Sequence, residues 1–78
     1  MKTVKPLAEN VKLEYVGNIL TGCEFGMGAD SGRDVTVPQL ITDAYLGKNG
    51  GDMGIYLVLE DGEDVFVYDN EDVYLEDE

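Results

Sequence analysis

Apolar and polar residues alternate in the first part of the chain. Residues 11–16 (VKLEYV) carry an apolar side chain at every second position, which predicts a half-buried strand. Gly17-Asn18 then predicts a two-residue hairpin turn. Residues 19–25 predict the returning strand, with Gly22 marking a bulge or weak point within it. The short β-branched run at 33–37 predicts a third strand.

A different period begins near Pro38. Apolar residues now recur three and four positions apart, which is the spacing of one face of a helix. Proline suits the first position of a helix, where its missing N–H costs nothing, and Gly47 follows as a C-terminal stop. The pattern therefore predicts a helix over about 38–46, whose apolar stripe consists of Val37, Leu40, Ile41, Ala44 and Tyr45.

The last third of the chain has the densest strand pattern. Residues 55–59 (IYLVL) form a continuous apolar run, as in a strand covered on both faces. Asp61-Gly62 predicts a type I′ hairpin turn into a second strand at 65–68. Residues 73–75 predict a further strand, which would complete a three-strand meander. A short acidic tail, 76–78, follows.

These elements predict a single small acidic α+β domain spanning residues 1–78. Its order is ββ(β)-α-βββ, a mainly antiparallel sheet of about five to six strands with one covering helix near 38–46. A lone helix can bury its apolar stripe only against the sheet, which is why we expect it to cover one face. A bent sheet that closes toward a partial barrel is the alternative.

Charge is distributed unevenly along the chain. The net charge is −12, from 17 acidic and 5 basic residues, and residues 51–78 contain 11 acids and no Lys or Arg. A field of one sign attracts basic partners and is repelled by nucleic acid and by anionic lipid surfaces. We therefore expect neither direct nucleic-acid binding nor membrane association. The single cysteine, Cys23, allows no intrachain disulfide, so we expect a cytoplasmic location, in a host cytoplasm if the chain is phage-encoded.

The residues that most enzymes need are missing from the sequence. There is no histidine, which removes the commonest general base and the commonest zinc ligand. The acidic clusters lack the spacing of a calcium-binding EF-hand loop. Cys23 has no basic neighbour in sequence to lower its pKa, and it is expected to be a small core residue. We expect no enzymatic activity, no metal site and no cofactor.

The candidate binding residues are the acids of the expected turns. Turns fix the spacing of their side chains. The ten acids of residues 60–78, around an object as long as one strand, about 17–20 Å, approach the phosphate density of duplex DNA, roughly one charge per 1.7 Å. Tyrosines among them are candidate anchors, because tyrosine is frequent at interface hot spots and binds cations through its ring. The predicted partner-binding set is Glu60, Asp61, Glu63, Asp64, Asp69, Glu71 and Asp72, with Tyr68 and Tyr74.

The leading hypothesis is a small non-catalytic inhibitor that mimics nucleic-acid phosphates. As a monomer or homodimer, it would occupy the basic channel of a DNA- or RNA-binding protein or complex. In size, charge and lack of catalytic residues the chain is similar to small acidic phage-encoded proteins that block restriction (anti-restriction), CRISPR (anti-CRISPR) or repair enzymes by DNA mimicry. That resemblance includes no motif, so it assigns no residues. The alternative is a structural or assembly adaptor whose acidity serves only solubility.

Overall fold

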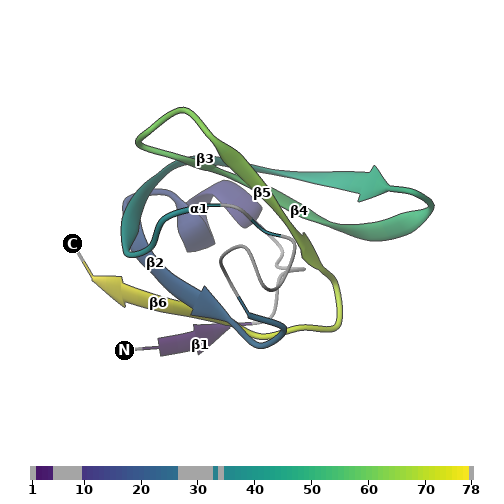
Figure 1. Cartoon of the computed structure of the whole chain (residues 1–78), viewed down its shortest axis with the longest axis horizontal. Helices are drawn as coiled ribbons and strands as arrows, with labels where there is room; N and C mark the ends of the chain where they lie inside the picture. The colour runs from purple at the N-terminus through teal and green to yellow at the C-terminus, as the bar shows by residue number, and fades with distance from the viewer. Residues whose placement is uncertain (1, 5–9, 27–32, 34, 78) are drawn as a thin grey trace.

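The computed structural model of this chain describes residues 2–4, 10–26, 33 and 35–77, which form a bent antiparallel sheet and one short helix (Figure 1). The elements are β1 (Lys2–Val4), α1 (Val11–Tyr15), β2 (Asn18–Cys23), β3 (Gln39–Asn49), β4 (Asp52–Leu59), β5 (Asp64–Tyr68) and β6 (Val73–Asp77). Across the sheet the strands follow the order β1-β6-β2-β3-β4-β5. The broad α+β, antiparallel prediction is confirmed, although the helix is minor. Five strands have five or more residues, and three-residue β1 extends one edge.

The sheet bends where β2 meets β3. These two strands pair only near their first residues, Ile19 with Leu40 and Leu20 with Gln39, and then run apart. Strands β1, β6 and β2 therefore form one half of the sheet, and β3, β4 and β5 form the other (Figure 1). The alternative considered above was a bent sheet that closes toward a partial barrel, and the structure shows the bend (Figure 1). The long β3–β4 hairpin extends away from the bend (Figure 1).

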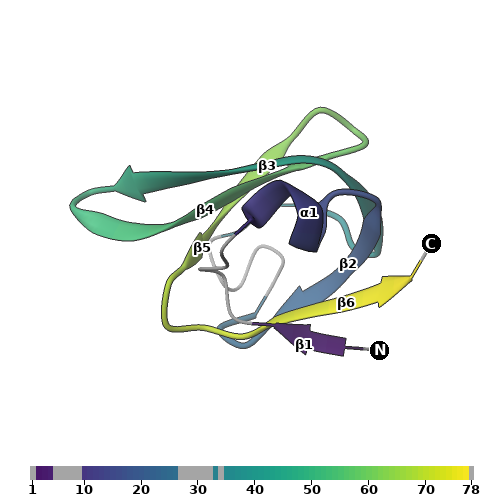
Figure 2. The ribbon, with the colours of Figure 1, turned by 180° about the vertical axis from the view of Figure 1, so that it is seen from behind.

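The core fills the inside of the bend. Helix α1 lies across the opening between the two halves (Figure 2) and contributes two buried side chains. Their spacing, four positions apart, puts them on one face of the short helix. The buried apolar residues are Val11, Tyr15, Leu20, Cys23, Ile41, Ala44, Ile55, Leu57, Leu59, Val65, Val67, Val73 and Leu75.

The prediction of a strand at 11–16 is wrong, because these residues form α1 and a turn. Asn10 caps the helix, since its side-chain oxygen accepts a hydrogen bond from the N–H of Leu13 at 3.1 Å. Leu13, which the alternating pattern placed inward, is 80% exposed. Gly17 has a φ of 89° and follows the helix as its C′ residue, rather than forming a hairpin turn.

The prediction of a helix near 38–46 is also wrong, because these residues belong to strand β3. A bulge at Thr42 explains the error: Ile41 pairs with Leu59, but Asp43 pairs with the next residue of β4, Val58. The extra residue brings Ile41 and Ala44, three positions apart, onto the buried face. A bulged strand thus has the apolar spacing of a helix. Gly47 lies within the strand instead of ending a helix.

Strand β2 contains a second bulge of the same kind, next to Gly22, where the sequence predicted a bulge or a weak point. The pairing of β2 with β6 shifts between Leu20 and Gly22. Leu20 and Cys23, again three residues apart, are buried. The predicted strand 19–25 is confirmed over Ile19–Cys23, and the bulge interrupts the regular alternation of its side chains.

The predicted hairpin in the last third of the chain is confirmed as β4 and β5, but its turn type is wrong. A type I′ turn needs a positive φ at both central residues, whereas Gly62 (φ 92°) alone has one here. The N–H of Leu59 donates to the carbonyl of Glu63 and the N–H of Gly62 donates to that of Leu59, which makes a longer loop.

The predicted three-strand meander and the loose acidic tail are wrong. Strand β6 leaves β5 and pairs with β1 and β2 instead. It includes Glu76 and Asp77, which pair with Ile19 and Asn18, so these two acids have a fixed backbone; Glu78 lies outside the described residues. The expected strand at 33–37 is absent from its described residues, Arg33 and 35–37, where only Arg33 makes an isolated bridge. Strand β1 was not predicted.

Candidate binding surface

Six acids gather at the bend of the sheet. Glu76 pairs with Ile19 on β2, Ile19 pairs with Leu40 on β3, and the N–H of Glu60 donates to the carbonyl of Leu40. The end of β6 and the turn between β4 and β5 therefore flank the same short stretch of sheet. We call this set the corner cluster, and it consists of Glu60, Asp61, Glu63, Asp64, Glu76 and Asp77, all exposed.

Hydrogen bonds fix two carboxylates of the corner cluster. Asp61 accepts from the side-chain N–H of Gln39 at 2.9 Å and from the backbone N–H of Glu63 at 2.8 Å. The carboxylate of Glu60 accepts from the backbone N–H of Leu40 at 3.2 Å. Because each residue is held at both backbone and side chain, the turn is an ordered feature rather than a flexible acidic loop.

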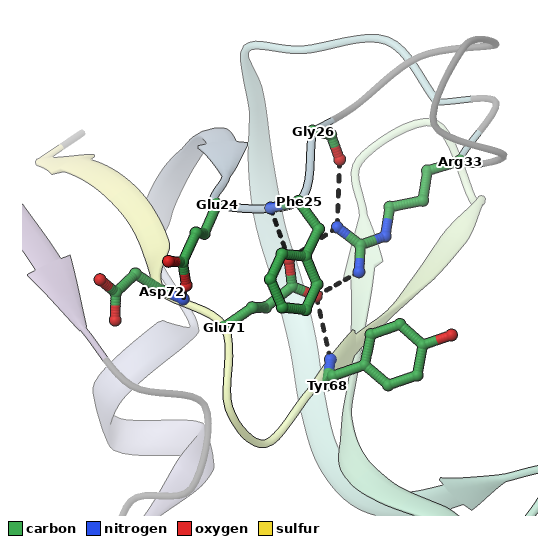
Figure 3. Close-up of polar contacts among 7 residues, drawn as sticks. All are labelled: Glu24, Phe25, Gly26, Arg33, Tyr68, Glu71 and Asp72. Atoms are coloured by element: carbon green, nitrogen blue, oxygen red, sulfur yellow. Dashed lines mark hydrogen bonds and ion pairs between the residues drawn. The ribbon is translucent and has the colours of Figure 1, made fainter.

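Glu71 belongs to the interior, which contradicts its prediction as a partner-binding residue. Its side chain is fully buried and forms an ion pair with Arg33, whose side chain is 10% exposed (Figure 3). The same carboxylate accepts from the backbone N–H groups of Phe25 at 3.1 Å and Tyr68 at 3.0 Å. These contacts connect the turn after β2 with the end of β5. Glu71 therefore holds the two halves of the sheet together at this point.

The environment of the buried pair keeps Arg33 charged. Burial lowers the pKa of Arg33, but the hydrogen bond and the negative charge of Glu71 outweigh it and leave that pKa above its usual value. The guanidinium also donates to the carbonyl of Gly26 at 3.1 Å and lies 5.8 Å from the centre of the Tyr68 ring. This ion pair could not be predicted from sequence patterns, because Arg33 and Glu71 lie 38 positions apart in the chain.

The remaining predicted acids, Asp69 and Asp72, lie at the far end of β5 from the corner cluster. The backbone N–H of Asp69 donates to the carbonyl of Met53, which brings the β3–β4 and β5–β6 turns together. Asp72 is half-buried beside Glu24: the N–H of Glu24 donates to the carbonyl of Asp72 at 2.8 Å, and the N–H of Asp72 donates to the carboxylate of Glu24 at 3.0 Å. A five-residue strand separates the two acidic groups by about 17 Å. The predicted carboxylates thus lie at two ends of the sheet.

A continuous row of aromatic rings lies between these ends. Tyr45 stacks on Tyr56 with ring centres 5.4 Å apart, and the row continues through Phe66 to Tyr68 with spacings of 5.1 and 5.2 Å. Phe25 ends the row, 6.2 Å from Tyr68. In β4 and β5 the neighbours of these residues are buried in the core, so alternation places the rings on the outer face.

The two tyrosines chosen from sequence have different surroundings. Tyr68 is 37% exposed and stands between Phe25 and Phe66 at the end of the aromatic row. Tyr74 is half-buried on β6, where its ring faces Gly22 of β2. The structure therefore places the two residues in different halves of the sheet, and Tyr68 alone lies among the outer aromatic side chains.

Cys23 is poorly placed for nucleophilic chemistry. Burial and the nearby negative charge of Glu71 raise the pKa of its thiol to about 12, although Arg33 opposes them. In the part of the chain that the structure describes, no group of three or more Cys, Asp or Glu side chains is arranged to hold a metal ion. Among the same residues, no helix is long and apolar enough to cross a membrane.

The buried thiol gives a testable pH dependence. A raised folded pKa stabilises the fold below the ordinary thiol pKa of 9.0, and this contribution is lost as the pH rises toward about 12. At pH 8 we expect Cys23 to react with a chromogenic disulfide reagent about a thousandfold more slowly in the native protein than in urea. Equal rates in both conditions would show that the thiol is accessible.

Three residues near the far acidic end were missed from the sequence. Asp52 and Met53 lie between the predicted elements 38–46 and 55–59, and Phe25 is the last residue of the predicted strand 19–25. The register between the predicted strands 55–59 and 65–68 could have identified Asp52 and Met53. Pairing 55–59 with 65–68 brings the start of β4 beside the end of β5, and therefore Met53 beside Asp69.

Comparison of the chain with protein-family models, with curated proteins and with solved structures gives no match.

Proposed function

We propose that this chain is a non-catalytic acidic binding protein that occupies the basic nucleic-acid-binding surface of a partner. Its carboxylates would take the places of phosphate groups, as in anti-restriction and anti-CRISPR inhibitors of the phage-encoded type. The observation that carries the proposal is the corner cluster, in which strand pairing and hydrogen bonds give six exposed acids a fixed arrangement.

The charge density is lower than that of DNA but of the same order. Twelve net charges on a molecule 32 Å long amount to on the order of one per 3 Å, compared with roughly one per 1.7 Å for the duplex. Among the residues whose exposure the structure describes, nine acids are exposed, and the exposed lysines are Lys12, which pairs with Asp43, and Lys48. The outer surface is therefore suited to long-range attraction of a basic protein.

Capture from a cell lysate at low salt tests the proposal. We expect the immobilised protein to retain nucleic-acid-binding proteins, and duplex DNA or RNA added in excess to release them. Raising the salt from about 50 to 200 mM should weaken the complex steeply, because the attraction of exposed charges is screened. A captured partner that ignores both competitor and salt would contradict phosphate mimicry.

The corner cluster can be tested with charge-matched variants. The double change Glu63→Gln and Asp64→Asn removes two negative charges at exposed positions, and we expect it to weaken the captured complex about tenfold. The control Thr3→Lys and Asn49→Lys alters the net charge equally but outside the cluster, and should cost less than about threefold. Equal losses in both variants would mean that total charge matters rather than the arrangement.

An assembly adaptor remains the second candidate, because apolar side chains are exposed away from the corner cluster. Leu46 on the β3–β4 hairpin is 55% exposed, and Leu13 of α1 is 80% exposed. An adaptor would dock through such side chains, and its binding would change little with salt. Replacing Leu13 and Leu46 with Ser distinguishes the two functions, because only the adaptor should lose its partner.

A further inference from the structure

A hollow lies beside the exposed ring of Tyr68, and we propose that it binds an arginine side chain of a partner protein. The hollow has a volume of about 440 Å³. It combines aromatic, thioether and carboxylate groups at the meeting point of two turns. We call it the Tyr68 hollow, and its lining residues are Phe25, Gly51, Asp52, Met53, Tyr68, Asp69 and Asn70.

Two aromatic rings form a wall of the hollow. Phe25 is 51% and Tyr68 37% exposed, and their ring centres lie 6.2 Å apart at an interplanar angle of 50°. Phe66 supports Tyr68 from the side in an edge-on contact at 5.2 Å. Figure 3 shows the Tyr68 ring directed away from the buried Glu71. Aromatic faces of this kind attract cations through their negative ring electrons.

Carboxylates stand beside these rings. Asp52 and Asp69 are both exposed, and their turns are held together by the hydrogen bond from the Asp69 N–H to the carbonyl of Met53. The ion pairs Lys12–Asp43 and Arg33–Glu71 use neither of them. The hollow therefore offers two negative charges and two aromatic rings within one small volume, which is the chemistry that recognises a cation.

The protein already contains such a contact. The guanidinium of Arg33 lies 5.8 Å from the centre of the Tyr68 ring, so this ring accepts an arginine in the folded state. Glu71 neutralises Arg33 through its ion pair. An incoming guanidinium would therefore be attracted by Asp52 and Asp69, and the neutral Arg33–Glu71 pair would not repel it.

Arginine fits the hollow better than lysine does. Its planar guanidinium stacks on aromatic rings and offers forked N–H donors to carboxylates, whereas the lysine ammonium is a compact, strongly hydrated charge. Phosphate-binding surfaces of proteins are rich in arginine, so this inference deepens the proposed function and rests on it. It assigns the Tyr68 hollow to one arginine of the partner and leaves the corner cluster as a second contact region.

Peptide titration tests the hollow without the partner. The probes are three blocked peptides, acetyl-Gly-Xaa-Gly-amide, in which Xaa is arginine, lysine or the uncharged arginine analogue citrulline. We expect the arginine peptide to shift the backbone amide NMR signals of Phe25, Met53, Tyr68 and Asp69, and to bind at least threefold more tightly than the lysine peptide. Citrulline should give no saturable shift.

Variants locate the binding on the protein. Asp69→Asn and Tyr68→Leu should each weaken the arginine peptide about three- to tenfold. The matched controls are Asp77→Asn in the corner cluster and Tyr45→Leu at the other end of the aromatic row, where the exposed fraction is a similar 42%. Thermal unfolding checks that each variant is folded. If Tyr68→Leu does not fold, Asp69→Asn alone tests the hollow.

Several outcomes would overturn the inference. Equal binding of arginine and lysine, binding of citrulline, or equal losses in the variants and their controls would each leave only general charge attraction. Failure here is distinguishable from failure of the proposed function. A partner still released by duplex DNA, with an arginine peptide that does not bind, would remove the Tyr68 hollow and keep the corner cluster.

Discussion

Replacing Glu71 with Ala should lower the free energy of unfolding by about 3–5 kcal/mol, because it removes the carboxylate that pairs with a buried guanidinium. The carboxylate is fully buried and pairs with Arg33. It also accepts from the backbone N–H groups of Phe25 and Tyr68, which would lose that partner. Urea unfolding followed by circular dichroism measures the change.

Two comparisons separate the buried pair from a simple loss of charge. Asp69→Ala removes an acid two positions away that is exposed, and should change the stability by less than about 0.5 kcal/mol. The double change Arg33→Met and Glu71→Leu should cost less than the sum of the two single changes, because no unpaired charge remains. A loss below about 1 kcal/mol for Glu71→Ala would mean that the pair does not hold the two halves of the sheet together.

The second large effect is expected from Gly54→Ala, with a loss of about 2–4 kcal/mol. A Cβ atom at this position would overlap the backbone carbonyl oxygen of Val67 and lie 2.7 Å from Cζ of Phe66. The carbonyl belongs to the β4–β5 pairing and cannot rotate away as a side chain can. The added methyl group must therefore separate the two strands.

A second glycine provides the matched control for this substitution. Gly22 also lies within a strand, but a Cβ there would be 3.6 Å from the Tyr74 ring, an ordinary contact. Gly22→Ala should change the stability by less than about 1 kcal/mol. Thermal and urea unfolding of both variants test the contrast, and similar losses would show that neither strand packs as described.

Local patterns predicted the strands that pair with near neighbours in sequence. The β4–β5 hairpin follows from two apolar runs and one Gly-containing turn, all within 17 residues. The same rules failed for β3, because a bulge at Thr42 gives a strand the apolar spacing of a helix. They failed for α1 because five residues are too few to distinguish alternation from a helical repeat.

The candidate site was predictable only where exposure follows from being in a turn. Glu60, Asp61 and Glu63 were expected on the surface and lie there. Glu71 was in the same kind of acidic turn, yet it is buried. Its burial depends on Arg33, and no sequence pattern pairs two residues that lie 38 positions apart. The association of Glu76 with the acids of 60–64 likewise depends on strand order across the bend.

The bulge at Thr42 adds one residue to β3 and so shifts the inward and outward alternation of its side chains by one position. In an uninterrupted strand, residues at odd and even positions face opposite sides, so one extra residue reverses the assignment for everything that follows it. Beyond Thr42 this reversal puts Ala44 inside and Tyr45 outside, where it stacks on Tyr56. Tyr45, the first ring of the outer aromatic row, therefore faces outward because of the number of residues before it as much as because of its own side chain. A shortened or lengthened relative would present a different surface from nearly the same composition.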